Sequence, residues 1–314
     1  MLSSATSSNP SLSSQSHLNF PCCMIDLGLI AYQSAYQIQK DHVNGILEGK
    51  SSCLIVCEHD PVFTLGRLAR EDHILFAQDS IKKRGVAIVR IDRGGEVTFH
   101  GPGQLVIYPI FRLDNWGRDL KVYLEKLEQV AIDLLKHFGI VANSISGKRG
   151  VWVEAKKIVS MGVGVRRWVS YHGMAVNVNT DLNFFQMIRP CGMDVQMTSI
   201  CDIKGQPVDM GEFKVKVFDV FAKHFQLEYT RSLRMIEVKM PDLGEDIKKA
   251  IVSFWFFKVG DKVQKDEDIV EVTTDKATFN VAATTSGQLN KILVAQGQEV
   301  TVGDPLAILQ EASS

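Results

Sequence analysis

Residues 21–232 combine two hydrophobic patterns, one typical of helices and one typical of strands. In residues 118–138 apolar side chains recur at helical spacing, and Gly139 follows at the expected stop. Further helices are predicted over residues 31–47 and 212–226. Apolar runs predict strands over residues 53–57, 86–91, 104–111, 151–153, 158–165 and 174–178. Because helices and strands do not alternate regularly, the pattern favours an α+β layer sandwich with mainly antiparallel or mixed pairing.

From residue 235 onward, short strands and turn residues replace this mixture, and a repeat with a spacing of 37 residues is visible. Residues 260–263 correspond to 297–300, and residues 268–272 correspond to 305–309. Two similar halves predict a small all-β domain with approximate two-fold symmetry. Lys276 lies between two strand-like runs, so it is expected at a hairpin tip. A short linker is expected near residues 232–235.

Length and composition set the class of protein. The 314 residues allow two domains, and 45% hydrophobic with 23% charged residues is the balance of a soluble globular protein. The 35 basic residues nearly cancel the 36 acidic ones, so no nucleic-acid or membrane partner is expected. No apolar run approaches the roughly 18 residues of a membrane span. Residues 235–314 hold 8 Lys and 13 acidic residues, which leaves 27 basic and 23 acidic before them, so the two parts could attract each other.

The N-terminal twenty residues and the cysteines indicate a compartment. Eight serines and no charged residue predict a disordered tail over residues 1–20, without the basic residues of a signal peptide or a mitochondrial presequence. A cytoplasmic protein with reduced thiols is therefore expected. The six cysteines form no C-x-x-C pair, which argues against a structural zinc site.

Three short segments and one cysteine are candidates for chemistry. Residues 93–104 contain four glycines, which let backbone approach a ligand closely, but no phosphate-loop context surrounds them. Residues 157–162 and 171–175 are expected to place small and polar residues at strand ends. Cys191 stands between Pro190 and Gly192 on an expected loop, where a nearby cation such as Lys157 would lower its pKa. Taken alone, a cysteine such as Cys191 is more often a small buried apolar residue than a nucleophile.

Five ordered motifs resemble the lipoyl (octanoyl) transferase family. They are EHDPVFTLG from Glu58, RGGEVTFHGPGQLVIYP from Arg93, KIVSMG from Lys157, YHGMAVNVNTDL from Tyr171 and RPCG from Arg189. The resemblance implies a biotin/lipoate ligase-like α/β sandwich over residues 21–232. It also implies transfer of an octanoyl group from acyl carrier protein to a lysine of a lipoyl domain in a 2-oxoacid dehydrogenase complex. No metal or other cofactor is implied for this transfer.

The resemblance also assigns roles at matching positions. Cys191 would be the nucleophile that accepts the acyl group as a thioester, and Lys157 would lower its pKa. The acyl pocket would be lined by Arg93, Gly94, Gly95, Glu96, Val97, Thr98, Phe99, His100, Ser160, Met161, Gly162, Gly173, Met174 and Ala175.

The C-terminal part has its own resemblance. MPDLGED from Met240, VGDKV from Val259, TDKAT from Thr274 and VGDPLAIL from Val302 are similar to the lipoyl domains of 2-oxoacid dehydrogenase acyltransferases. A barrel-sandwich hybrid is implied over residues 236–312, with Lys276 as the lysine that carries an octanoyl or lipoyl group. Lys276 would then accept the acyl group from the catalytic domain of its own chain or of another copy. The short linker favours transfer between chains.

Two other functions compete with this interpretation. An ATP-dependent lipoate or biotin ligase would share the fold but form an acyl-adenylate, and it would need no cysteine in the position of Cys191. A non-catalytic lipoyl carrier would use only the C-terminal domain, and it would have no reason to keep both Lys157 and Cys191.

Overall fold

The computed structural model describes residues 19–189, 195–244, 247–275 and 277–311. Cys191 and Lys276 lie outside the described residues, as do residues 1–18 of the expected tail. The helices are α1 (Tyr32–Leu47), α2 (Gln78–Lys83), α3 (Leu120–His137), α4 (Ile200–Lys204) and α5 (Met210–Phe225), with short 3-10 turns η1 (Glu71–His73), η2 (Leu113–Trp116) and η3 (Leu182–Met187).

The strands fall into an N-terminal and a C-terminal group. The first group is β1 (Phe20–Ile30), β2 (Ser52–His59), β3 (Val62–Leu65), β4 (Ala87–Arg90), β5 (Val97–His100), β6 (Gln104–Ile110), β7 (Asn143–Ile145), β8 (Lys148–Val153), β9 (Lys156–Arg166) and β10 (Val169–Asn177). The second group is β11 (Leu227–Lys239), β12 (Lys249–Trp255), β13 (Lys262–Val263), β14 (Asp268–Thr273), β15 (Thr278–Ala282), β16 (Gly287–Ile292), β17 (Glu299–Thr301) and β18 (Pro305–Glu311).

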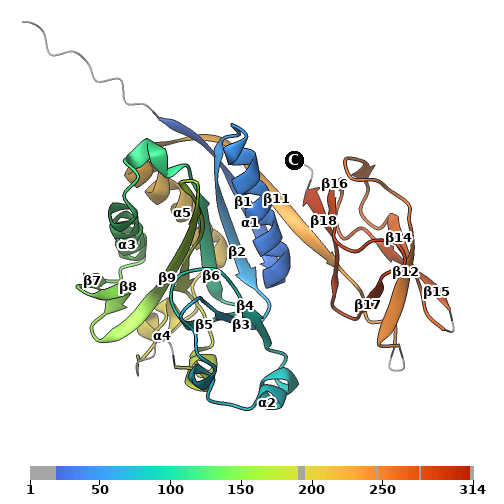
Figure 1. The fold of residues 1–314 in the computed structure, drawn as a ribbon, viewed down its shortest axis with the longest axis horizontal. Helices are drawn as coiled ribbons and strands as arrows, with labels where there is room; N and C mark the ends of the chain where they lie inside the picture. Colours follow the sequence, from blue (N-terminus) through green and yellow to red (C-terminus); the bar gives the residue numbers. More distant parts are fainter. Residues whose placement is uncertain (1–18, 190–194, 245–246, 276, 312–314) are drawn as a thin grey trace, which may run out of the picture.

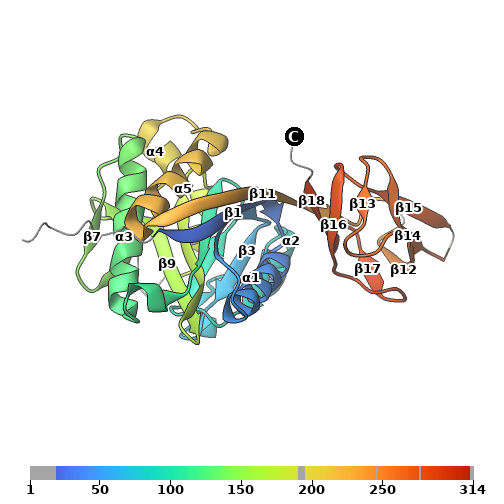
Figure 2. The same cartoon turned by 90° about the horizontal axis from the view of Figure 1, so that it is seen from above.

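Seven of the N-terminal strands and β11 form one twisted sheet with helices on both faces (Figures 1 and 2). Its order is β11-β1-β2-β6-β10-β9-β8-β7, in which β1 is parallel to both neighbours and the later pairs are antiparallel. Side chains alternate along β2, so Leu54 and Val56 pack with α3 and α5 while Ile55 and Cys57 pack with α1. The mixed α+β sandwich expected from the sequence is confirmed.

A smaller sheet in the order β4-β3-β5 lies beside the large one. Its core contains Phe63, Phe99 and Phe185, with the Phe99 ring stacked on Phe184 at a centroid distance of 4.5 Å. The segment of residues 93–97 leads directly into β5. This small sheet therefore supports one of the segments singled out for chemistry.

The C-terminal strands form a second, all-β unit (Figure 1). One of its sheets has the order β15-β14-β12-β17, and the other is the β13-β16-β18 end of the large sheet. The sequence repeat is confirmed as structural symmetry, because β13 and its counterpart β17 lie at sheet edges while β14 and its counterpart β18 lie inside. Strands β14 and β15 form the expected hairpin, and Thr274 N–H donates to Ala277 O across its turn at 2.9 Å.

Strand β11 joins the two parts without a flexible linker. Its first half pairs with β1 in parallel, and its second half pairs with β18 in antiparallel fashion. Residues 232–235, where the sequence predicts a linker, therefore belong to a continuous strand. Met235 and Ile308 are buried in the same apolar cluster as the inner face of α1. The expectation failed because residues 227–239 gain hydrogen-bonding partners far away in the chain, and no local pattern shows these.

The charge difference between the two parts does not determine how they meet. Lys239 pairs with Asp60 at 2.6 Å, and Lys291 pairs with Asp41 of α1. Both lysines come from the more acidic C-terminal part, and both aspartates come from the more basic N-terminal part. Local pairs decide the contact because net charge is screened over about 8 Å at physiological salt.

Helix ends follow local capping chemistry in two of the three long helices. Asp119 accepts hydrogen bonds from the N–H groups of Lys121 and Val122 at the start of α3, and Asp209 does the same for Glu212 in α5. Helix α1 differs because it starts after Ala31, whose side chain has no polar atom. Among the described residues, no helix is long and apolar enough to cross a lipid bilayer.

Candidate functional site

Strands β9 and β10 bring two of the predicted segments face to face. In their antiparallel register, Gly162 lies opposite Gly173, Met161 opposite Met174 and Ser160 opposite Ala175. The expectation that these residues lie at strand ends is wrong, because both strands continue beyond them. Gly94 N–H donates to Val163 O at 3.1 Å and so attaches the third segment to β9.

Close backbone packing explains the glycines at this junction. A Cβ atom on Gly173 would stand 2.2 Å from Ile107 O, and one on Gly162 would stand 2.9 Å from Gly94 O. Neither position has room for a side chain. The three segments can therefore meet only with glycine at both sites.

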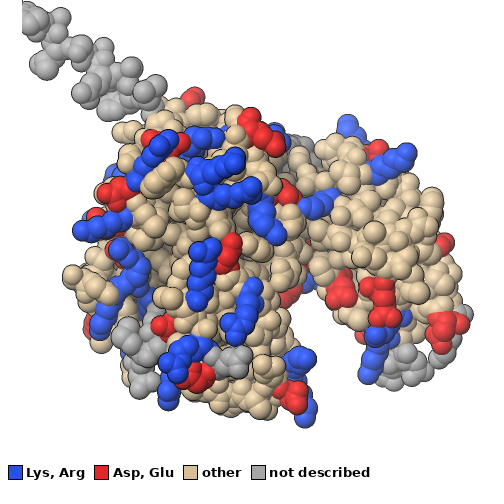
Figure 3. Space-filling model, viewed as in Figure 1, with Lys and Arg blue, Asp and Glu red and all other residues tan. Residues whose placement is uncertain are grey.

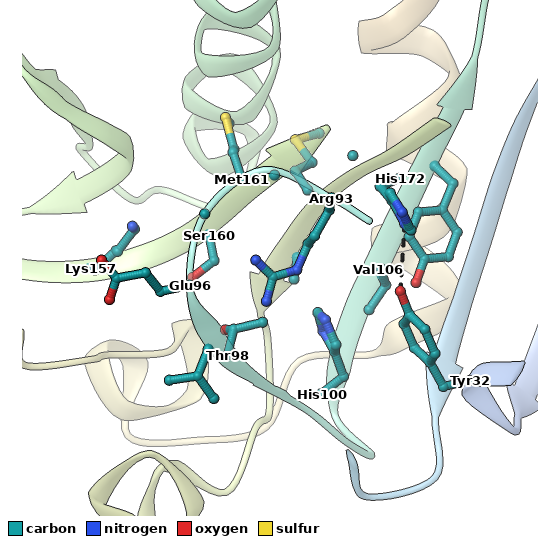
Figure 4. Close-up of a pocket in the computed structure, with 17 residues that line it drawn as sticks. Tyr32, Arg93, Glu96, Thr98, His100, Val106, Lys157, Ser160, Met161 and His172 are labelled. Carbon is teal, nitrogen blue, oxygen red and sulfur yellow. Dashed lines mark hydrogen bonds between the residues drawn. The ribbon is translucent and has the colours of Figure 1, made fainter. Parts of the chain in front are cut away.

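A cavity lies where the segments meet (Figure 4). Its lining includes the predicted residues Arg93, Gly95, Glu96, Val97, Thr98, His100, Lys157, Ser160, Met161, Gly162, Gly173, Met174 and Ala175. Gly94 instead lines a neighbouring hollow, and Phe99 points into the core of the small sheet. The phenyl ring turns away because alternate side chains of a strand face opposite sides.

Four lining residues were not expected from the sequence, namely Tyr32, Val106, Tyr108 and His172. Tyr32 is the first residue of α1, and its hydroxyl lies 3.5 Å from His172 Nδ1. Figure 4 shows Lys157 at one end of the pocket and Tyr32 with His172 at the other. The cavity is thus elongated, with Lys157 and Glu96 at one end and aromatic side chains at the other. His172 stands within a quoted motif, whereas Tyr32 carries no local signal.

Lys157 is held at its end of the pocket by backbone and aromatic contacts. Its Nζ lies 5.4 Å from the centre of the Trp152 ring, and its aliphatic chain passes over Gly150, where a Cβ would stand 2.6 Å from Lys157 Cε. Its backbone N–H donates to Gln196 O at 2.8 Å, and Thr198 N–H donates to Lys157 O at 2.9 Å. Residues 196–198 are therefore bound alongside Lys157.

Residues that precede Cys191 in the sequence are hydrogen-bonded as well. Arg189 N–H donates to His73 O at 2.8 Å, and Leu75 N–H donates to Met187 O. Cys191 is two residues after Arg189 and five residues before Gln196.

A second hollow adjoins the pocket at Lys157. It shares Gly95, Lys157, Met161 and Gly162 with the pocket and continues past Leu124 toward Lys148. Lys157 therefore stands where an elongated cavity opens into a wider, mostly apolar space. A molecule could approach Lys157 from this side while the pocket is occupied.

Arg93 braces the wall of the pocket. Its guanidinium is buried and donates to Thr64 O at 2.8 Å and to Thr64 Oγ1 at 3.0 Å. These bonds tie the loop before β5 to strand β3. Its positive charge also contributes to the lowered pKa values of His100 and His172, for which burial is the main cause.

Two buried histidines lie at the aromatic end. His59 Nδ1 lies 3.0 Å from Ile30 O, and because a carbonyl can only accept, Nδ1 carries the proton. Its Nε2 then accepts from the Tyr108 hydroxyl at 2.7 Å. Burial lowers the pKa of His59 to about 4, so the ring is neutral near pH 7. Burial likewise lowers the pKa of His100, whose Nδ1 lies 2.7 Å from Gln104 Oε1.

A carboxylate orients the third histidine. Asp92 accepts from His172 Nε2 at 2.9 Å, from Tyr36 at 2.9 Å and from Tyr171 at 2.8 Å. The hydrogen bond from His172 is the largest cause that lowers the pKa of Asp92. His172 has a positive φ of 55°, which is uncommon for a residue other than glycine and often marks a functional site.

The face of the molecule drawn in Figure 3 carries charged side chains of both signs. Figure 3 shows Lys and Arg side chains scattered over the N-terminal part, with acidic side chains between them. On the same face, acidic side chains also stand toward the lower end of the C-terminal unit.

Comparisons with known sequences place both parts of the chain. The family described as "Lipoyl protein ligase A/B catalytic domain" matches residues 31–222, and the family described as "Biotin-requiring enzyme" matches residues 236–309. An octanoyltransferase of Solibacter usitatus is 41% identical over 208 residues, which cover 66% of this chain and 94% of that protein. An octanoyltransferase of Syntrophotalea carbinolica is 44% identical over 203 residues, covering 64% and 91%.

Solved structures share the fold at low sequence identity. A lipoate-protein ligase A bound with ATP matches 68% of this chain and 89% of its own, with a TM-score of 0.55 and 14% identity. A bipartite lipoate protein ligase from Thermoplasma acidophilum matches 68% and 88%, with a TM-score of 0.55 and 15% identity. The chain therefore belongs to the lipoyl protein ligase A/B catalytic-domain family as an acyltransferase, and it carries a C-terminal domain of the biotin- and lipoyl-attachment type.

Proposed function

We propose that this protein moves an octanoyl group from acyl carrier protein to lipoyl-domain lysines, which is the first step of making protein-bound lipoate. The observation that carries the proposal is the elongated pocket with Lys157 at one end, built from three of the segments that resemble the octanoyltransferase family. Residues 21–232 form the catalytic domain and residues 236–312 the lipoyl domain.

The chemistry needs two transfers through Cys191. The Cys191 thiolate attacks the carbonyl of the octanoyl thioester, the carbon–sulfur bond to the carrier breaks, and the carrier leaves as a thiolate that takes a proton from water. The ε-amine of an acceptor lysine then attacks the new thioester, the amide forms, and the Cys191 thiolate departs while the amine loses its proton. A thioester is already activated and the amide is more stable, so no nucleotide or metal is required.

The geometry supports this assignment of roles. An octanoyl chain would lie in the pocket with its carbonyl near Lys157 and its methyl end near Tyr32 and Tyr108. Residues 196–198, which follow Cys191 in the sequence, are bound to the Lys157 backbone, and a positive charge at Lys157 would favour the thiolate of a nearby cysteine. The adjoining hollow leaves space for the donor thiol and then for the acceptor lysine.

The acceptors would be lipoyl domains of 2-oxoacid dehydrogenase complexes and the chain's own C-terminal domain at Lys276. The hairpin turn between β14 and β15 is the matching position, with Thr274 and Ala277 closing it. An octanoyl or lipoyl group on Lys276 would be covalently attached by an amide.

The first prediction tests this function. Purified Lys276→Ala protein mixed with octanoyl-acyl carrier protein, without ATP, should gain one octanoyl group on Cys191, seen by intact-mass and peptide mass spectrometry. Cys191→Ala should abolish transfer to an isolated lipoyl domain, whereas Cys201→Ala, outside the proposed pathway, should keep it. Transfer that requires ATP, or that survives in Cys191→Ala, would show a ligase mechanism instead.

A further inference from the structure

Helix α1 is capped by a residue from outside the catalytic domain. Ala31 precedes the helix with φ −58° and ψ 138°, where Ser, Thr, Asp or Asn usually supplies a capping oxygen. Here Glu237 Oε2 accepts a hydrogen bond from Ala31 N–H at 3.0 Å. Glu237 stands in the second half of β11, within the segment that matches the biotin- and lipoyl-attachment family.

Glu237 is deeply buried in this contact. Its side chain is 1% exposed, and burial raises its pKa. The charged groups that face it are Lys239, with Nζ 3.7 Å from Glu237 Oε2, and Asp60, with Oδ2 2.6 Å from the same Nζ. A buried carboxylate is tolerated when it is paired and hydrogen-bonded, so these partners hold Glu237 in place.

The peptide group between Ile30 and Ala31 links Glu237 to the pocket through hydrogen bonds on both of its sides. The N–H of Ala31 and the C=O of Ile30 belong to the same planar peptide. Glu237 accepts from its N–H side, while His59 Nδ1 donates to its C=O side at 3.0 Å. His59 Nε2 accepts from the Tyr108 hydroxyl at 2.7 Å. Hydrogen bonds in such a chain polarise and orient one another.

The positions of both aromatic residues at the far end of the pocket depend on this peptide. Tyr108 is reached through His59, and Tyr32 follows Ala31 directly in the chain. The Tyr32 ring also lies 5.2 Å from the His59 ring, centre to centre. A rotation of the Ile30–Ala31 peptide would therefore move both walls of the end that is opposite Lys157.

We propose that Glu237, held by Lys239, is a positioning residue of the acyl pocket, so that the lipoyl domain sets the length of acyl chain that the catalytic domain accepts. The proposal rests on the proposed function in one respect, namely that the pocket binds an acyl chain. The methyl end of that chain would contact Tyr32 and Tyr108. Small shifts there change which chain fits, because one buried methylene is worth roughly a fourfold preference.

The functional test compares donors of different length. Glu237→Ala should change the ratio of kcat/KM for octanoyl over decanoyl carrier protein by roughly fourfold or more. Glu237→Gln keeps an oxygen for Ala31 N–H and should retain the ratio. Lys291→Ala is the matched control, because it removes another pair between the C-terminal domain and α1, at Asp41, away from the pocket. A ratio that is equal in wild type and Glu237→Ala would overturn the proposal.

A second measurement does not depend on acyl transfer. The His59 Nδ1 proton should give a slowly exchanging NMR signal in the wild type, in Glu237→Gln and in Lys291→Ala. In Glu237→Ala it should shift and exchange faster. If the signal is the same in all four proteins, the proposed link is absent even if the enzyme is an octanoyltransferase. If the signal responds but no octanoyl transfer occurs in the wild type, only the proposed function fails.

A third variant covers the case in which Glu237→Ala does not fold. Lys239→Met removes the ammonium that pairs with Glu237 and Asp60 while it keeps the length of the side chain. It should shift the His59 signal and the donor ratio in the same direction, by a smaller amount. No change in either quantity would again contradict the proposal.

Discussion

Lys157 illustrates how a cation is fixed at a single position. Its backbone is bound to residues 196–198 on one side, while Trp152 and Gly150 confine its side chain. An ammonium held this way loses little conformational freedom when it acts on a nearby group. Its effect on a thiol at that end of the pocket should therefore be measurable as a change in ionisation.

The second prediction concerns this effect. Lys157→Ala should move the pH profile of Cys191 alkylation by iodoacetamide upward by about one unit or more, because the thiolate loses a nearby positive charge. Peptide mass spectrometry would follow Cys191 separately from the other thiols. Lys156→Ala, which changes an exposed neighbour, should leave the profile in place. An unchanged profile in Lys157→Ala would assign the charge to another group.

The buried histidines also give a prediction for stability against pH. The pKa of His59 is about 4 in the folded protein and about 6.5 when exposed, so the unfolded chain binds more protons between these values. Stability should therefore fall as pH decreases from about 6.5 to 4, by roughly 3 kcal/mol from His59. Burial lowers the pKa values of His100 and His172 as well, and these shifts act in the same direction.

Urea unfolding at several pH values checks this third prediction. His59→Asn, which keeps a donor for Ile30 O, should flatten the dependence between pH 6.5 and 4. His137→Asn serves as the control, because His137 is exposed on α3. Equal slopes in wild type and His59→Asn would contradict the assignment of a buried neutral ring.

At the scale of elements, the pairing of β9 with β10 builds the pocket. Two glycine-containing segments meet residue by residue, and the backbone of β6 packs directly against Gly173. The strands could form without glycine at this point, but they could not approach as closely. The pocket therefore depends on the register in which β9 and β10 pair.

The fourth prediction follows from this packing. Gly173→Ala should lower the free energy of unfolding by about 1 to 3 kcal/mol, because its Cβ would overlap Ile107 O and Pro109 Cδ. Acyl loading should fall as well. Gly45→Ala in α1 is the control, since its Cβ meets only the flexible end of Lys50 and alanine favours a helix. Urea unfolding compares the two variants, and equal stability would show that β6 can yield.

At the scale of the whole molecule, β11 decides how the two domains meet. A continuous strand, the apolar contact of Ile308 with the α1 cluster, and the ion pairs of Lys239 and Lys291 together fix the lipoyl domain on one side of the catalytic domain. Figures 1 and 2 show the turn between β14 and β15 at the end of the lipoyl domain that faces away from the catalytic domain.

This arrangement leads to the fifth prediction, that Lys276 is modified by another copy of the chain. Mixing a Cys191→Ala chain with a Lys276→Ala chain should restore octanoylation of Lys276 on the former, at a rate that rises with protein concentration. Mass spectrometry distinguishes the two chains. No modification in the mixture, together with a wild-type rate independent of dilution, would instead establish transfer within one chain.

The sequence by itself determined the features that depend on local period and local chemistry. Helical spacing located α1, α3 and α5, the 37-residue repeat predicted the symmetry of the second domain, and clustered glycines marked the walls of the pocket. These features are visible because each is encoded within a short stretch of neighbouring residues.

Only the tertiary structure decided the far end of the pocket and the union of the domains. Tyr32 and Tyr108 reach the pocket because β2 and β6 pair beneath α1, and Glu237 caps Ala31 from 206 residues away. Strand β11 likewise gains partners at both ends of the chain. Strand order and register bring such residues together. A pattern among neighbours along the chain does not show which distant strand will pair with that segment.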